Sequence, residues 1–204
     1  MNVYAKGMPN ELLRLQNMHN GEKAVPTFSA AEMTRRQDGL RKILAELKLD
    51  AAILTSYHNI CYFSDFLYCY FGRRYAFVVT PQKAISVSAG IDAGQPWRRT
   101  FGDNITYTDW RRDNYFHALQ EALPGVKRLG IEFDHVNIEL RKLLQDAFPE
   151  VEFVDIGSPT MWLRTIKSPE EIALIKEGAR PADIGGEAVR DAIREGVPEY
   201  EVAL

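Results

Sequence analysis

The sequence predicts an α/β fold: a three-layer α/β/α arrangement in which helices cover both faces of a mixed β-sheet. Segments whose apolar residues recur at helical spacing alternate with short, continuous apolar runs, which are typical of strands buried on both faces. Two of these runs are joined by the tight turn Pro81-Gln82-Lys83, so this part of the sheet is expected to be antiparallel. No internal repeat or low-complexity segment in the sequence indicates another architecture.

Three helices of this domain are predicted from their ends and their apolar faces. The first begins at Ser29, where Ser29 and Glu32 fit a capping box, and runs to about residue 48. The second ends at Pro124-Gly125, and the third begins at Asn137 and ends at Pro149, since neither proline nor glycine readily continues a helix. Their apolar faces are, in turn, Leu40, Ile43, Leu44 and Leu47; Tyr115, Phe116, Leu119, Ala122 and Leu123; and Leu140, Leu143, Leu144, Ala147 and Phe148.

The strands are predicted over residues 51–55, 75–80, 84–87, 105–108, 129–132 and 151–154. We expect residues 29–160 to form one domain, because the helices and strands alternate without interruption over this range. Residues 1–28 lack a sustained period and predict an arm on the surface of the domain, with a short helical turn at Leu12, Leu13 and Leu15.

Residues 161–204 predict a linker and the start of a truncated second domain. Ser168, Pro169 and the acids after them are typical of a helix start. A long helical segment follows, and we expect a bend or a break near Arg180, because Pro181 cannot donate a helix hydrogen bond. An apolar helix face needs a partner to bury it, so a domain beyond Leu204 is expected. The face comprises Ile172, Ile175, Ala179, Ala182, Val189, Ala192 and Ile193.

The composition excludes several classes of protein. A net charge of -3, with 25 basic residues interleaved among 28 acidic ones, argues against a nucleic-acid surface. No apolar stretch approaches the roughly 20 residues that span a bilayer, and no segment resembles a signal peptide, so neither a membrane partner nor export is expected. Cys61 and Cys69 are too few for a disulfide framework. We therefore expect reduced thiols and a cytoplasmic protein.

Neither a nucleophile nor a metal site is indicated by the pattern of reactive side chains. His58 and Cys61 share one short segment, which rarely aims both groups at a substrate, so catalysis there is not favoured. The other histidines are scattered without metal-ligand spacing, so no metal is expected. Four carboxylates at the ends of elements are expected to be solvated or to cap helices, and none pairs as acid and base: Asp109, Asp113, Glu132 and Asp134.

The loop before the predicted strand 75–80 is the best candidate for a binding site. It places Arg73 beside Gly72 and Phe71 in a connection between two core elements, where binding residues tend to lie. An arginine fork suits a carboxylate, and a phenylalanine ring can pack on an N-methyl or cationic group. On pattern alone, a solvated surface arginine remains the favoured interpretation. The motifs 97–99 and 110–112, each Trp-Arg-Arg, are equally explained by stacking at an interface.

Five stretches carry a family resemblance, at residues 55–60, 62–69, 71–73, 94–100 and 107–110. They resemble the creatinases, or creatine amidinohydrolases, and the likeness runs from about Thr27 to the last residue. The less specific stretch 166–171 is similar across the wider pita-bread superfamily, which includes prolidase and aminopeptidase P.

The resemblance implies the ribonuclease H-like N-terminal domain of creatinases and prolidases, followed by the first helix of a pita-bread domain. It implies hydrolysis of creatine to sarcosine and urea by a homodimer that uses no metal or other cofactor. Phe71 and Arg73 match the positions that bind the substrate carboxylate, and no catalytic residue is expected within this segment, since the family's catalytic groups would lie beyond Leu204. Two alternatives remain open: a non-catalytic dimerisation or binding module, and the N-terminal domain of a metal-dependent peptidase of the aminopeptidase P or prolidase type.

Overall fold

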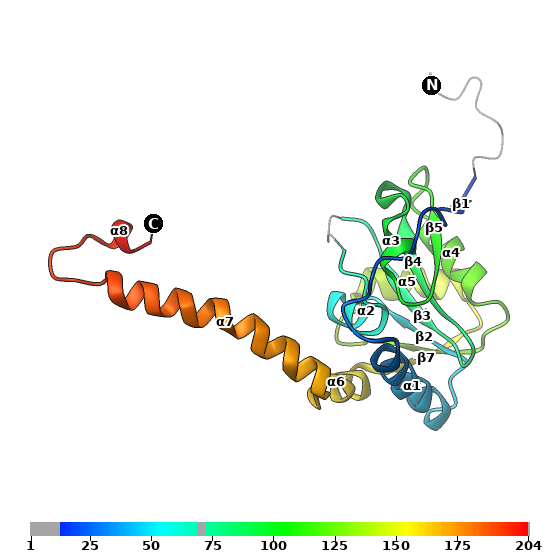
Figure 1. The fold of residues 1–204 in the computed structure, drawn as a ribbon. Helices are drawn as coiled ribbons and strands as arrows, with labels where there is room; N and C mark the ends of the chain where they lie inside the picture. The colour runs from blue at the N-terminus through cyan, green and yellow to red at the C-terminus, as the bar shows by residue number, and fades with distance from the viewer. Residues whose placement is uncertain (1–12, 69–71, 204) are drawn as a thin grey trace, which may run out of the picture. The chain divides into compact units, whose positions relative to one another are not determined.

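The computed structural model of the chain describes residues 13–68 and 72–203. The chain forms two compact units that divide between Thr165 and Ile166 (Figure 1). The first unit contains, in chain order, β1 (Leu15–Gln16), α1 (Ala30–Glu46), β2 (Ala51–Leu54), α2 (Tyr57–Ser64), β3 (Ala76–Val79), β4 (Ala84–Ala89), the 3₁₀ turn η2 (Gly90–Asp92), α3 (Gln95–Arg99), β5 (Asp103–Tyr107), α4 (Asn114–Ala122), β6 (Arg128–Ile131), α5 (Ile138–Ala147), β7 (Glu152–Asp155) and α6 (Gly157–Thr165). The second contains α7 (Pro169–Ala192) and α8 (Glu199–Val202).

The first unit is built on a mixed sheet with the strand order β1-β5-β4-β3-β2-β6-β7. The hairpin predicted around Pro81 is confirmed, because β3 and β4 pair antiparallel. β3 is also antiparallel to β2, whereas β2, β6 and β7 are parallel, as are β4 and β5. The strands β2, β4, β5, β6 and β7 therefore share one direction, and their carboxyl ends meet at one edge of the sheet. We call this the carboxyl edge.

Helices cover both faces of this sheet, which confirms the predicted three-layer fold. Every residue of β2, β3 and β4 is buried, so neither face of the central strands meets solvent. Helix α4 packs on β4 and β5 and against α5, while α1 and α2 pack on β3 and α1 also packs against α6 (Figure 1). The largest fully buried side chains include Phe63, Phe77 and Tyr115. Burial of each such side chain stabilises the fold by about 1.5–3 kcal/mol.

The start of α1 combines a helix cap with a buried ion-pair cluster. The hydroxyl of Ser29 accepts a hydrogen bond from the backbone N–H of Glu32 at 3.1 Å, as the sequence predicts. The carboxylate of Glu32, only 5% exposed, accepts from Arg35 at 2.7 and 2.8 Å and from Arg36 Nε at 2.8 Å. The guanidinium of Arg36 lies 3.8 Å from the centre of the Phe28 ring and 4.3 Å from that of Tyr62. These contacts join the end of the arm to α1 and α2.

The Glu32 cluster should make stability depend on pH. The hydrogen bond from Arg35, together with Arg36, lowers the pKa of Glu32 to about 2. A carboxylate whose folded pKa is depressed stabilises the fold above its unfolded value near 4.5 and loses that contribution as the pH falls toward 2. We expect the free energy of unfolding, measured in urea, to fall by on the order of 2–3 kcal/mol between pH 6 and pH 2 through this group. In Glu32→Gln this component should be absent, and an unchanged pH dependence would contradict the assignment.

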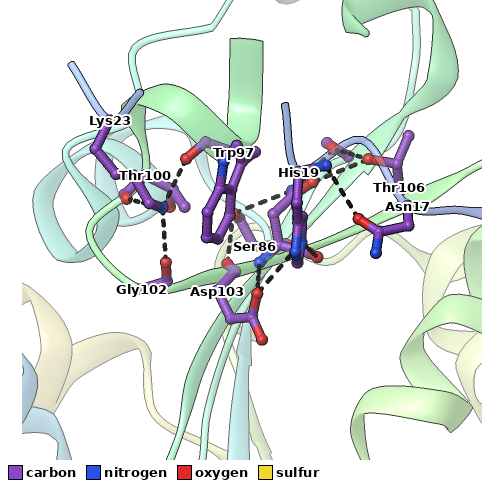
Figure 2. Close-up of polar contacts among 11 residues, drawn as sticks. Asn17, His19, Lys23, Ser86, Trp97, Thr100, Gly102, Asp103 and Thr106 are labelled. Atoms are coloured by element: carbon purple, nitrogen blue, oxygen red, sulfur yellow. Dashed lines mark hydrogen bonds and ion pairs between the residues drawn. The ribbon is translucent and has the colours of Figure 1, made fainter. Parts of the chain in front are cut away.

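The arm is held on the sheet by a short strand and by a cluster around Trp97. The helical turn expected at Leu15 is wrong, because Leu15–Gln16 forms β1 and pairs with β5; extended backbone there satisfies the hydrogen bonds of an edge strand. His19 stacks on the Trp97 ring with centroids 4.0 Å apart, and its Nε2 lies 2.8 Å from the carbonyl oxygen of Asn104. Lys23 Nζ lies 3.6 Å from the ring centre and donates to three carbonyl oxygens, those of Trp97, Thr100 and Gly102 (Figure 2). Trp97 thus anchors the arm, together with Arg98, whose Nε donates to the carbonyl oxygen of Glu22 at 3.1 Å, whereas Arg99 donates to Gln95 of its own helix.

The second unit is dominated by α7. The predicted start is confirmed, since the Ser168 hydroxyl accepts from the Glu171 N–H at 3.2 Å and the Glu171 carboxylate accepts from the Ser168 N–H at 2.8 Å. Of the bend or break expected near Arg180, the break does not occur, since α7 continues through Pro181 to Ala192. A proline removes one donor at a cost of about 3 kcal/mol, but the hydrogen bonds of the neighbouring turns remain and carry the helix through. No described residue of α7 is buried.

Within residues 13–68 and 72–203, no helix combines the length and the apolar character that crossing a membrane requires.

Candidate functional site

The carboxyl edge brings together segments that are far apart in the sequence. Because β3 runs opposite to its neighbours, the residues before it, Gly72 to Tyr75, lie at the same edge as the ends of β4 and β5. A hollow of about 920 Å³ opens there. In open α/β sheets, ligands commonly bind outside the carboxyl ends of the strands. The charged residues that line the hollow are Arg73, Arg74, Asp109, Arg111, Arg112, Asp113 and Glu139, and its aromatic residues are Tyr75, Tyr107, Tyr115 and Phe116.

Arg73 reaches this hollow and forms an ion pair that its sequence neighbours do not reveal. Its Nε donates to Asp109 Oδ1 at 2.6 Å, and its side chain is 45% exposed. Asp109 lies two residues after the end of β5 and is paired with Arg73, so the expectation of a merely solvated or helix-capping carboxylate is wrong for this residue. The fold places the two charges side by side because the loop before β3 and the loop after β5 share one edge.

Buried phenols hold the backbone just before β3. The hydroxyl of Tyr107 donates to the carbonyl oxygen of Arg74 at 2.9 Å, and that of Tyr115 donates to the carbonyl oxygen of Tyr75 at 3.4 Å. The hydroxyl of Tyr75 donates to the carboxylate of Asp92. Burial raises the pKa of Tyr107 to about 12 and raises the pKa of Tyr75 and Tyr115 as well. The three phenols therefore remain protonated donors, and two of them fix the carbonyl groups of Arg74 and Tyr75, which follow Arg73 in the chain.

Gly72 gives the loop a conformation that other residues adopt at a cost. Its φ is +60°, in the left-handed region, and a Cβ at this position would meet no atom within 4 Å. Substitution is therefore opposed by backbone strain and not by a clash.

We expect Gly72→Ala to lower the free energy of unfolding by about 1 kcal/mol, which corresponds to a fall of about 2–4 °C in Tm, measured by circular dichroism. The matched control is Gly178→Ala in α7, where a Cβ also meets open space but the backbone is helical. That substitution should raise helical stability by about 0.5–1 kcal/mol. If both substitutions change the stability in the same direction, backbone strain at Gly72 is not the cause.

Glu132 forms a buried hub next to the hollow, and the expectation that it is solvated is wrong. It is 1% exposed. Its Oε2 accepts from the backbone N–H groups of Thr55 at 2.5 Å and Ser56 at 2.9 Å, and its Oε1 accepts from the Ser56 hydroxyl at 2.5 Å and from Asn59 Nδ2 at 2.6 Å. These donors lie at the start of α2, where the helix dipole favours a negative charge. Glu132 thus ties the end of β6 to the β2–α2 connection.

His135 lines the hollow and is linked to Glu132 through the hydroxyl of Thr55. Its Nδ1 lies 3.1 Å from the hydroxyl oxygen of Thr55. The hydroxyl of Thr55 also lies 3.5 Å from Glu132 Oε2. No signal in the sequence singled out these contacts, because they join residues on different strands.

None of the other residues singled out in the sequence adds a nucleophile or a metal ligand to the hollow within the described part of the chain. Phe71 and Cys69 lie outside the described residues. Cys61 is partly buried and donates to the carbonyl oxygen of Phe66 at 3.5 Å, and burial raises the pKa of its thiol, which is the opposite of what a nucleophilic thiolate needs. His58 is exposed beside it. Within the described part of the chain, no three His, Cys, Asp or Glu side chains gather to form a metal site.

The chain is similar to a family of known proteins and to individual enzymes. Residues 36–166 match the family described as the Creatinase/Prolidase N-terminal domain. The chain is 57% identical over 194 residues to the creatinase of Bacillus sp. (strain B-0618), and this match covers 93% of the chain and 47% of that enzyme. The chain spans about half the length of the curated relatives that it matches.

Solved structures have the same fold. The prolidase from Pyrococcus horikoshii OT3 superposes with a TM-score of 0.69 at 21% identity, over 83% of this chain and 46% of the prolidase. The Xaa-Pro dipeptidase from Bacillus anthracis gives the same TM-score at 23% identity, again over 83% of this chain and 46% of that enzyme. At such identities the likeness establishes the architecture of the sheet and its helices.

Proposed function

Because this chain belongs to the family of Creatinase/Prolidase N-terminal domains, we propose that it positions the substrate of a creatinase, which hydrolyses creatine to sarcosine and urea. The observation that carries the proposal is the half-exposed guanidinium of Arg73, which lines the hollow at the carboxyl edge. The 57% identity with a creatinase over nearly the whole chain supports creatine as the substrate. Phe71, which lies outside the described residues, is proposed to pack on the substrate beside Arg73.

The reaction explains why a positioning arginine is useful. Water attacks the guanidinium carbon of creatine, the bond from that carbon to the sarcosine nitrogen breaks, and a proton moves to the departing amine. Creatine and water thereby give sarcosine and urea. The carboxylate lies at the far end of the substrate from the reacting carbon. An arginine that grips it with two charge-assisted hydrogen bonds holds the carbon in line with the water, which lowers the entropic part of the barrier.

The groups that activate the water are proposed to lie in a part of the enzyme that follows Leu204. The matched relatives are about twice as long as this chain, which supports this division of labour. We further propose that the enzyme acts as a homodimer in the cytoplasm, as the resemblance to creatinases suggests. Analytical ultracentrifugation of the longer enzyme tests the dimer.

A hybrid enzyme tests the proposed function directly. This chain replaces the matched 194 residues of the Bacillus creatinase and is joined to the remainder of that enzyme, and urea release from creatine is measured. We expect turnover by the hybrid and none by the 204-residue chain alone. Circular dichroism establishes that both proteins are folded. Urea production by the chain alone would contradict the division of labour, and a folded hybrid that releases no urea would contradict the proposed function.

A further inference from the structure

We propose that Asp109 is a positioning residue that orients the guanidinium of Arg73 toward a substrate carboxylate, an inference that rests on the proposed function of Arg73. The two residues come from different segments, since Arg73 precedes β3 and Asp109 follows β5. The folded sheet brings Arg73 Nε and Asp109 Oδ1 to 2.6 Å. A contact this short is typical of a charge-assisted hydrogen bond.

The atom that Asp109 engages decides which edge of the arginine remains available. A guanidinium offers two edges to an oxyanion, one formed by Nε with one terminal nitrogen and one formed by both terminal nitrogens. Asp109 takes the Nε position. Among the described residues, the terminal nitrogens of Arg73 make no hydrogen bond, and the side chain is 45% exposed. The outer edge, which suits a bidentate carboxylate, is thus left for the substrate.

Asp109 can orient the arginine because it is itself fixed. Its Oδ2 accepts from the backbone N–H of Ile91 at 3.2 Å, in the 3₁₀ turn η2 that follows β4. The backbone beside Arg73 is fixed as well, since the Tyr107 hydroxyl donates to the carbonyl oxygen of Arg74 at 2.9 Å. The arginine is therefore held near both ends of its side chain, which reduces the rotamer freedom that it would lose on binding.

A positioning role and a purely electrostatic role for Asp109 predict opposite results. The Asp109 carboxylate repels an incoming carboxylate, so its removal should strengthen substrate binding if charge alone matters. If Asp109 positions Arg73, its removal should weaken binding, because the guanidinium becomes free to rotate. Creatine and N,N-dimethylguanidine separate these effects, since the second compound has the same reacting guanidinium and no carboxylate.

Asp109→Ala and Asp109→Asn test the proposal in the 204-residue chain and in the hybrid enzyme. In the chain, ¹H–¹⁵N NMR follows hydrogen exchange of the Arg73 Nε–H, assigned from its disappearance in Arg73→Lys. We expect Asp109→Ala to speed this exchange by about tenfold or more. In the hybrid, it should raise KM for creatine by about tenfold and change kcat/KM for N,N-dimethylguanidine by less than about twofold. Asp109→Asn keeps an acceptor for Nε, so its exchange rate and its KM for creatine should lie between those of the unaltered protein and those of Asp109→Ala.

The control is Asp146→Ala, since Asp146 is an exposed carboxylate of α5 that does not line the hollow. It should leave all of these values unchanged. If Asp109→Ala lowers or does not alter KM for creatine while Arg73→Ala raises it, Asp109 does not position Arg73 and the proposed function stands. If Asp109→Ala lowers kcat/KM equally for creatine and for N,N-dimethylguanidine, Asp109 has a structural role only. If Arg73→Ala itself leaves the KM for creatine unchanged, the proposed function fails first.

Discussion

Arg73→Ala is expected to lower kcat/KM of the hybrid enzyme for creatine by about 100-fold. A hydrogen bond to a charged group contributes about 1.5–3 kcal/mol, and the loss of orientation at the reacting carbon adds to this effect. KM should rise and kcat should fall, because the fork both binds the substrate and aligns it. Steady-state kinetics of urea release provide the measurement. N,N-dimethylguanidine serves as the comparison substrate, because it has no carboxylate for Arg73 to bind.

Two further variants define what the loss means. Arg73→Lys keeps the charge but loses the planar fork and the Nε–H that Asp109 accepts, so its kcat/KM should lie between those of the unaltered hybrid and Arg73→Ala. Arg99→Ala removes an exposed arginine of α3 that does not line the hollow, and it should change little. Arg73 does not bind the carboxylate if Arg73→Ala and Arg99→Ala have the same kcat/KM for creatine. The same conclusion follows if Arg73→Ala lowers kcat/KM equally for creatine and for N,N-dimethylguanidine.

Glu132→Ala is expected to destabilise the first unit by about 3–5 kcal/mol. The substitution removes the acceptor of four close hydrogen bonds, two of them from backbone N–H groups, at a position that water does not reach. Each buried donor left unpaired costs about 1–3 kcal/mol, although Ser56 can turn its hydroxyl elsewhere. Since a domain of this size is stable by only about 5–15 kcal/mol, the variant should unfold at much lower urea concentration or fail to fold at 37 °C.

Glu132→Gln should cost less, about 1–2 kcal/mol, because the amide keeps one acceptor and the shape of the side chain. Asn59 can turn its Oδ1, which has no hydrogen-bond partner among the described residues, toward the new amide. Glu150→Ala, an exposed carboxylate after α5, serves as the control and should stay within about 0.5 kcal/mol of the original chain. Urea unfolding followed by fluorescence gives these values, and a Glu132→Ala variant as stable as this control would refute the structural role.

The elements of the first unit could be predicted because their signals are local. Helix α1 begins where Ser29 offers a cap, and the hairpin of β3 and β4 turns where Pro81 directs it. Two expectations were wrong, for different reasons. Leu15 forms a strand because an edge of the sheet, built from residues more than 80 positions further along the chain, offers it hydrogen bonds. Pro181 does not interrupt α7, since the turns on either side keep their own bonds.

The candidate site could be predicted only in part. The loop around Arg73 stood out as a possible carboxylate site, but its ion partner did not, since Asp109 lies 36 positions away. Glu132 looked like an ordinary carboxylate at the end of a strand, because a single sequence does not show that its neighbours are Thr55, Ser56 and Asn59. The proposed role of Phe71 still rests on resemblance.

The amino-acid sequence by itself determined the α/β class and the order of most helices and strands, and it pointed to the arginine that we propose to hold a carboxylate. These depend on apolar spacing, caps and turns, which act over a few residues. The tertiary structure decided which way the strands run, and therefore that Arg73 and Asp109 meet at one edge of the sheet. It also decided that the carboxylate of Glu132 is buried. Such pairings depend on contacts between distant segments, whose free energy is realised only when the sheet is complete.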